Sequence, residues 1–258
     1  MPPITQPASR LTRRARRWTV WCAWLSALML LTATLLLLGA GPAYRQGWVA
    51  LGTAFTLLRQ GAQLAAGAGV LGVITLLSAS FGRHWRVALV GALVSLAVLA
   101  TLTVPMQMSQ RAQSVPPIHD ISTDLTSPPV FRALAAVREA APNEVDHPGA
   151  ATARQQQMAY PLIGPLVIDQ AMGQVLSVAE ALVRERGWAV AAVTADTIEA
   201  TATTPWFGFK DDVVIRLTPT TEGVRVDMRS ASRLGKSDLG TNAARIHAFL
   251  TELDGRTH

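Results

Sequence analysis

The sequence predicts an α-helical membrane anchor of three transmembrane helices, followed by a two-layer α+β sandwich with an antiparallel sheet and two helices on one face. Three observations lead to this fold class. Three long apolar runs occupy the first 105 residues, later stretches alternate apolar and polar side chains, and two amphipathic helical patterns accompany those stretches. We therefore expect a membrane region at 1–105, a tether at 106–117 and an extracytoplasmic α+β domain at 118–258.

Charge divides the chain at the tether. All 17 acidic residues follow Pro117, whereas ten of the 23 basic residues precede it, so thirteen basic residues oppose seventeen acidic ones afterwards. A basic chain often binds nucleic acid, but juxtamembrane arginines explain this excess, and we expect no nucleic-acid partner. The single cysteine, Cys22, allows neither an intramolecular disulfide nor a thiolate metal site. We expect no metal and no cofactor.

The first apolar run, 18–38, follows a group of basic residues: Arg13, Arg14, Arg16 and Arg17. A signal peptide also starts with a basic region, but its apolar part is typically only about 7–15 residues long. This run is longer and more apolar segments follow it. The sequence therefore favours an uncleaved transmembrane helix.

The second apolar region, 48–80, is interrupted near Arg59 and would be roughly 50 Å long as one helix, more than one bilayer crossing requires. We expect 62–79 to span, and 48–58 to form an extension or interfacial helix with Arg59 at the boundary. Arg59 in a conduction path is the alternative, although the three helices contain no acidic partner. The third span, 87–104, is expected to end at Pro105, and the following tether to be extended.

Basic residues flank the start of the first span and the turn after the second, while the first loop offers only Arg45. The positive-inside rule then places the N-terminus in the cytoplasm. Three crossings place the C-terminal domain in the periplasm or outside. The prediction is a multi-pass protein of the inner (cytoplasmic) membrane.

In the domain, local patterns predict each element in turn. We expect a short helix at 130–141, a loop at 142–149 and a strand at 162–168. A helix with Asp169 as N-cap and Gly187 just past its end follows. Strands are expected at 188–193, 197–203, 213–218 and 224–229, and a last helix after Ser237 or Asp238 as cap. Strand alternation leaves one face polar, and we expect water to cover it: Glu199, Arg216, Arg225, Asp227 and Arg229.

An aromatic turn, Trp206-Phe207-Gly208-Phe209, stands between two strands and precedes Lys210. The rings could present a ligand-binding surface with Lys210 as anion partner, or fold back as a lid over the core, with Gly208 supplying a positive φ. The core interpretation is preferred and the binding interpretation stays open. Lys210 and Lys236 are the only lysines of an arginine-rich chain, and both lie in loops of this kind.

Several short motifs together resemble the uncharacterised family catalogued as domain of unknown function 1499. The resemblance covers roughly 118–253, and family members similarly carry hydrophobic helices ahead of the domain. It implies no activity, substrate or catalytic residue. The motifs that carry it are 119–124, Pro128-Pro129, 159–161, 206–212, 229–233, Gly235, Ser237-Asp238, Asn242 and Arg245-Ile246.

The first functional hypothesis is that the domain binds membrane lipid headgroups, another envelope component or a partner protein. A cationic rim facing the membrane would contribute, formed by Arg225, Arg229, Arg233, Lys236 and Arg245. The candidate ligand-binding residues are Trp206, Phe207, Lys210, Asp211, Asp212, Arg229, Ser232, Arg233, Lys236, Asp238, Asn242 and Arg245.

Two alternatives remain at this stage. An envelope enzyme, hydrolase-like, could use Asp211 or Asp212 with His119 or a serine, although the chain has no Gly-x-Ser-x-Gly motif. Adjacent strand residues point to opposite faces, so we expect one carboxylate to pair with Arg229 or Arg233 instead. The domain could also be a structural module of a membrane complex. The sequence does not specify an oligomeric state.

Overall fold

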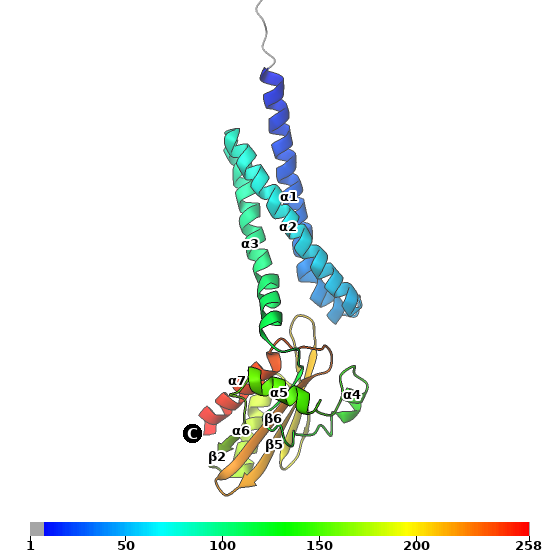
Figure 1. The fold of residues 1–258 in the computed structure, drawn as a ribbon, viewed down its shortest axis with the longest axis vertical. Coiled ribbons are helices and arrows are strands. Elements are labelled where there is room, and N and C mark those ends of the chain that lie inside the picture. Colours follow the sequence, from blue (N-terminus) through cyan, green and yellow to red (C-terminus); the bar gives the residue numbers. More distant parts are fainter. Residues whose placement is uncertain (1–7, 258) are drawn as a thin grey trace, which may run out of the picture. The chain divides into compact units, whose positions relative to one another are not determined.

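The computed structural model describes residues 8–257, with side-chain surroundings from residue 17 onward. Arg13, Arg14 and Arg16, which contribute to the topology prediction, lie outside the residues whose side chains are described. The chain forms two compact units, Met1–Ser109 and Gln110–His258 (Figure 1). We describe each unit by itself.

The first unit consists of three long helices: α1 (Ala8–Arg45), α2 (Leu51–Phe81) and α3 (Trp85–Ser114). Each contains a stretch apolar enough to cross a membrane, with mean hydropathy of 2.0, 1.9 and 2.5. Large apolar side chains such as Trp24, Leu35 and Leu96 are exposed, as expected of surfaces that face lipid. The three candidate membrane-spanning helices indicate a multi-pass membrane protein.

Small residues form the contacts between these helices. A Cβ atom on Gly91 of α3 would lie 2.6 Å from the backbone nitrogen of Leu76 and 2.7 Å from the carbonyl of Gly72, both on α2. Ala65 and Ala68 of α2 are fully buried. Such residues let helix backbones approach closely in lipid, where apolar surface alone does not drive association.

One helix boundary differs from the sequence prediction. α2 is one continuous helix through Arg59, which agrees with the extension alternative for the residues before it. α3 continues through Pro105 to Ser114, so the expected end at Pro105 and the extended conformation immediately after it are wrong. Proline removes only one backbone donor, and membrane helices tolerate the loss through local adjustment.

The second unit contains a six-stranded antiparallel sheet. Its strands follow the order β1-β6-β5-β4-β3, and β2 pairs with the other part of the β6 edge beside β1. The strands are β1 (Asp120–Ser122), β2 (Leu166–Ile168), β3 (Ala189–Val193), β4 (Thr197–Thr203), β5 (Lys210–Thr220) and β6 (Gly223–Ser232). The helices are α4 (Ala135–Glu139), α5 (Ala150–Ala159), α6 (Met172–Glu185) and α7 (Thr241–Thr257).

The main core lies between one face of the sheet and helices α6 and α7. Leu182 of α6 and Phe249 of α7 are fully buried, and the sheet contributes Ile198, Ile215 and Met228, also fully buried. Burying a side chain of this size contributes about 1.5–3 kcal/mol. The predicted α+β class, with two helices on one face of an antiparallel sheet, is confirmed.

Local signals at the helix ends were partly correct. Gly187 follows α6 with φ of 68°, as its predicted position requires. Asp238 accepts hydrogen bonds from the backbone N–H groups of Gly240 and Asn242, so it caps the start of α7. Asp169 is not the N-cap of α6, because that position is Ala171 and carries no side-chain bond.

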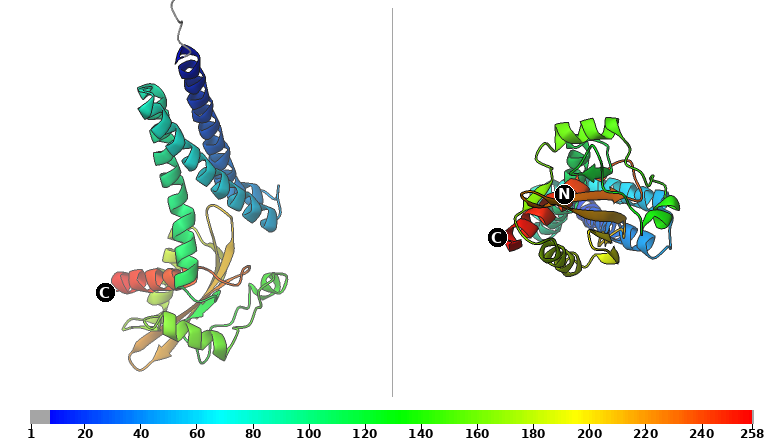
Figure 2. Two further views of the ribbon diagram at one scale, coloured as in Figure 1. Left: turned by 45° about the horizontal axis from the view of Figure 1, so that its top comes forward. Right: turned by 90° about the horizontal axis from the view of Figure 1, so that it is seen from below.

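Most of the opposite sheet face is covered by protein, contrary to the prediction, while the side chains of Arg216 and Arg225 are 28% and 37% exposed. Residues 123–149, which we call the strap, and α5 lie across it. The end-on view shows α5 and α6 on opposite sides of the strands (Figure 2). Glu199, Asp227 and Arg229, expected to be solvated, are at most 3% exposed. The sequence did not predict this cover, because β1, α5 and most of the strap are too short or irregular to show a period.

Candidate functional site

The aromatic turn joins β4 to β5 and is fixed by its own hydrogen bonds. The N–H of Thr204 donates to the carbonyl of Phe209 (2.8 Å), and the N–H of Gly208 donates to the carbonyl of Thr204 (3.0 Å). The N–H of Phe209 also donates to the Thr204 hydroxyl (2.8 Å). Gly208 has φ of 72°, which explains the need for glycine. These hydrogen bonds hold the backbone of residues 204–209 in one conformation.

The three rings of the turn pack on one another. Trp206 meets Phe207 edge-to-face at 4.9 Å between ring centroids, and Phe207 stacks on Phe209 at 4.7 Å. Trp206 is 39% exposed. None of the three belongs to either core cluster that the described residues of the domain form. The rings thus pack on one another at the end of a hairpin, and both interpretations of the turn stay predictions.

Both lysines lie at this same end of the sheet. Lys210 begins β5, and its carbonyl accepts the N–H of Arg233, the residue just after β6 (3.0 Å). Lys236 follows three residues later in the loop that leads to α7. Both lysines are exposed, and no acidic side chain in residues 17–257 forms an ion pair with either. The aromatic rings and two available cations thus share one end of the domain, which we call the aromatic end (Trp206, Phe207, Phe209, Lys210 and Lys236).

A first polar network lies on the helix side of the sheet. Arg245 donates to the carboxylate of Asp211 (2.6 Å) and to the hydroxyl of Ser230 (2.9 Å). Ser230 and Arg245 both donate to the side-chain oxygen of Asn242. The Asn242 amide donates in turn to the hydroxyl of Ser232 (3.1 Å). The group is largely buried and satisfied internally, so it positions α7 against β5 and β6.

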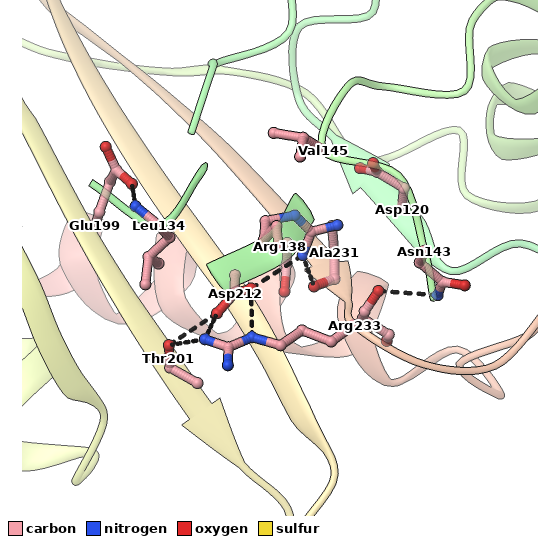
Figure 3. A network of polar contacts seen from close by, with 12 residues as sticks. Asp120, Leu134, Arg138, Asn143, Val145, Glu199, Thr201, Asp212, Ala231 and Arg233 are labelled. Atoms are coloured by element: carbon pink, nitrogen blue, oxygen red, sulfur yellow. Dashed lines mark hydrogen bonds and ion pairs between the residues drawn. The ribbon is translucent and has the colours of Figure 1, made fainter. Parts of the chain in front are cut away.

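A second network lies on the strap side and is centred on Asp212 (Figure 3). Its carboxylate accepts two bonds from Arg233 (both 2.8 Å), one from Thr201 (2.8 Å) and one from Arg138 of α4 (3.1 Å). The side chains of Asp212 and Arg138 are 0% exposed. Arg138 also donates to the carbonyl of Ala231 (2.9 Å). One carboxylate thus joins the strap, two strands and the loop after β6.

Two further carboxylates fasten the strap to the sheet. Asp120 receives three bonds from Arg229, at 2.7, 3.0 and 3.3 Å, and Arg229 donates onward to the carbonyl of Val145 in the strap (2.9 Å). Glu199 accepts the backbone N–H groups of residues 132–134, at 2.9, 3.0 and 2.9 Å. A carboxylate that accepts backbone N–H groups forms charge-assisted bonds, which are stronger than neutral ones.

The structure therefore divides the candidate site residues among three places and does not form one site from them. Asp212, Arg229 and Arg233 lie under the strap, whereas Asp211, Ser232, Asp238, Asn242 and Arg245 lie on the helix side. Trp206, Phe207, Lys210 and Lys236 lie at the aromatic end. This division follows from strand alternation, which sends adjacent residues of β5 and β6 to opposite faces.

The predicted cationic rim is also wrong. Of its five members only Lys236 is exposed without an acidic partner among the described residues. The arginines are used within the fold: Arg225 pairs with Asp227, Arg229 with Asp120, Arg233 with Asp212 and Arg245 with Asp211. The expectation that Asp211 or Asp212 pairs with Arg229 or Arg233 is confirmed for Asp212 and Arg233.

Electrostatics distinguish the buried acids. Burial acts to raise the pKa of Asp212, but the hydrogen bonds and charge of Arg233, with the Thr201 and Arg138 bonds, lower it below its ordinary value. Burial raises the pKa of Asp238 in spite of its two backbone N–H donors. Burial lowers the pKa of His147 in the strap, where the charge of Arg229 acts in the same direction. Asp212 is therefore built to stay ionised as a fastening group.

The geometry does not bring together the residues of the enzyme hypothesis. Asp211 and Asp212 each bind arginine on opposite sheet faces. The Nδ1 atom of His119 is buried without a hydrogen-bond partner, and within residues 17–257 no bond joins its ring to either carboxylate or to a serine. The carbonyl of His119 instead accepts bonds from Ser232 and Asn242, which ties the start of β1 to β6 and α7.

Sequence reasoning missed the strap residues that contact the sheet most closely. Arg138 and Asn143 were not singled out, although both bind atoms of β6 or of the loop after it. An arginine within a short, otherwise apolar helical pattern was the available signal for Arg138, since a buried arginine requires an acidic partner. The contacts of Asn143 depend on how its loop folds over the sheet, so no sequence pattern pointed to this residue.

The fold and the geometry of the site define a class of protein: an α+β domain, closed on both sheet faces, that follows three candidate membrane-spanning helices. Residues 120–253 match the family described as "Protein of unknown function (DUF1499)", which is more than half of the chain. The chain belongs to the DUF1499 family, as the motifs indicated. No curated protein matches the chain.

Proposed function

We propose that the domain is held at a membrane by its three helices and binds anionic phospholipid headgroups through the aromatic end. The observation that carries this proposal is the shared location of an aromatic cluster, whose Trp206 is exposed, and the only two lysines of the chain. Aromatic rings suit the boundary between acyl chains and headgroups, where one side is apolar and the other wet. A lysine near an anionic membrane surface gains about 1 kcal/mol.

The covalent structure supports this proposal. The chain enters the domain next to the same loop: the carbonyl of Ile118 accepts the N–H of Asp238 (3.1 Å), two residues after Lys236. Only three residues separate Ile118 from Ser114, the last residue of α3. Residues 115–119 are the whole connection between α3 and β1, the strand next to this loop.

The proposal includes a placement of the domain in the periplasm or outside the cell. Gly61 and Gly67 of α2 face Ala33 and then Met29 of α1, and Gly69 and Gly72 face Val98 and then Gly91 of α3, so each of these helix pairs is antiparallel. This arrangement groups Arg17, Arg83 and Arg86 at one end of the helices, which supports a cytoplasmic N-terminus under the positive-inside rule. A reporter fused after His258 tests it. Activity of a cytosol-specific reporter alone would overturn the placement.

Headgroup binding is tested on the full chain in nanodiscs, either of phosphatidylcholine alone or with phosphatidylglycerol added. We expect slower hydrogen exchange at residues 204–210 in the anionic discs. The double variant Lys210→Ala/Lys236→Ala should lose that difference, and Trp206→Ala should reduce it in both lipids. As a matched control, Arg184→Ala removes a charge from the exposed face of α6. Equal exchange in both lipids for the unaltered chain would refute headgroup binding.

A further inference from the structure

One strap residue controls the loop that carries Lys236. The side-chain amide of Asn143 donates to the carbonyls of Ser232 and Gly235, both at 2.9 Å. Its backbone N–H donates to the carbonyl of Arg233 (3.2 Å). Three carbonyl groups, one at the end of β6 and two in the loop after it, are thus bound by a single residue from a distant part of the sequence.

That loop adopts a backbone that depends on such support. Gly235, Leu239 and Gly240 have φ of 99°, 55° and 78°. Leucine rarely adopts the left-handed region, which costs of order 1–3 kcal/mol and persists only where neighbouring contacts hold it. Asp238 holds the second half of the loop through α7, and Asn143 holds the first half.

The strap itself is fastened by the ion pairs that also reach the loop. Arg138 lies five residues before Asn143 and binds Asp212, and the same carboxylate binds Arg233 at the start of the loop. Arg138 and Arg229 both lie over the ring of Phe131, with their guanidinium carbons 4.7 and 4.8 Å from its centroid. Strap position and loop position therefore share Asp212 as a common anchor.

We propose that the strap acts as a clasp that sets the conformation of the loop carrying Lys236, so that opening of the strap regulates binding at the aromatic end. The regulatory part rests on the proposed headgroup binding. The clasp itself is a property of the domain and has a separate readout. Segments with few apolar contacts open most easily. In the described strap, only Phe131, Leu134 and Val145 belong to or pack against an apolar cluster.

The test compares Asn143→Ala with a matched strap variant, Glu139→Ala, which changes an exposed residue of α4. Hydrogen exchange is measured on the full chain in the same two kinds of nanodisc. We expect Asn143→Ala to speed exchange at residues 233–237 by about 5- to 10-fold, the effect of a lost hydrogen bond. It should also remove the slowing by phosphatidylglycerol at residues 204–210. Glu139→Ala should change neither.

Arg138→Met provides the second variant, because it releases the fastening and keeps the Asn143 side chain. It should speed exchange in the strap and at residues 233–237 together. If Arg138→Met unfolds the domain, Asn143→Ala still tests the clasp, because Asn143 takes part in no ion pair of the described residues.

The outcomes separate the two proposals. Unchanged exchange at residues 233–237 in Asn143→Ala overturns the clasp. A faster loop with normal lipid-dependent slowing at residues 204–210 overturns the regulation. Absence of any lipid effect in the unaltered chain refutes headgroup binding, while the exchange of the loop still tests the clasp.

Discussion

The two faces of the sheet are covered by different chemistry. On one face, α6 and α7 bury a continuous apolar core that includes Leu182 and Phe249. On the other, the strap is held by polar contacts: Asp212 binds its Arg138 and Glu199 binds its backbone, while Arg229, paired with Asp120 of β1, donates to the carbonyl of Val145. On the apolar face each buried side-chain atom makes the free energy of folding more favourable. A buried ion pair must first offset the free-energy cost of removing both charges from water. We infer that the helix side provides stability and the strap side provides a defined, adjustable position.

The largest effect is expected from breaking the ionic side. Arg229→Met leaves Asp120 buried without its partner, and loss of one member of a buried pair costs about 3–5 kcal/mol. The free energy of opening, from hydrogen exchange of β6 amides, measures the loss. Adding Asp120→Leu should restore a large part of it, because the orphaned charge disappears. A double variant as unstable as Arg229→Met would contradict the ionic account.

A comparable but slightly smaller loss is expected on the apolar side. Leu182→Ala removes a fully buried side chain, which costs about 2–5 kcal/mol depending on how far the cavity collapses. No partner substitution should rescue it, in contrast to Arg229→Met. Leu162→Ala, at a residue that is 87% exposed, serves as control and should change stability by no more than about 0.5 kcal/mol. Hydrogen exchange of α7 amides reports both variants.

Glu199→Gln should have an intermediate effect confined to the strap. The neutral amide keeps one acceptor oxygen for the three backbone N–H groups of residues 132–134 and places a donor beside them. We expect a loss of about 1–3 kcal/mol. Faster hydrogen exchange at residues 132–135, with little change in α6 and α7, would show it. If hydrogen exchange in α6 and α7 rose as much as in residues 132–135, the strap and the helices would not be independent of each other.

The smallest expected effect is a pH dependence of the strap. Burial holds the pKa of His147 below 6.5, while Asp120 opposes and Arg229 reinforces that shift. The strap therefore has its full stability above pH 6.5 and loses stability as the pH falls through the lowered pKa, because the released strap binds the proton more readily. Hydrogen exchange of residues 144–149, corrected for the intrinsic rate, should show the loss. His147→Gln should abolish it.

Asp212 contributes to a separate and lower pH range. Its pKa is below 3.8, so its fastening contribution is complete above that value and is lost only as the pH falls further. A loss of strap protection that begins as the pH falls below 6.5, well above the range of Asp212, therefore reports His147. If it persists in His147→Gln, another group is responsible.

How much the sequence predicted depends on the length of each pattern. Val175, Leu182 and Val183 repeat at helical spacing, and β4 to β6 alternate over seven residues or more, so α6 and the central strands were found. β1 has three residues and α5 no apolar stripe, so neither shows a period. The sequence predicted that either Asp211 or Asp212 pairs with Arg229 or Arg233, and the structure shows the pair Asp212 and Arg233, which lie on one face of the sheet.

By itself, the sequence determined the three apolar helices, the antiparallel α+β class, the family and the separation of Asp211 from Asp212, because each follows from local periodicity or a contiguous motif. Only the tertiary structure decided that the strap covers most of the polar face, and that all four of the expected rim arginines are paired within the fold. Those outcomes depend on contacts such as Arg138 with Asp212, 74 residues apart. No local pattern specifies a partner at that separation.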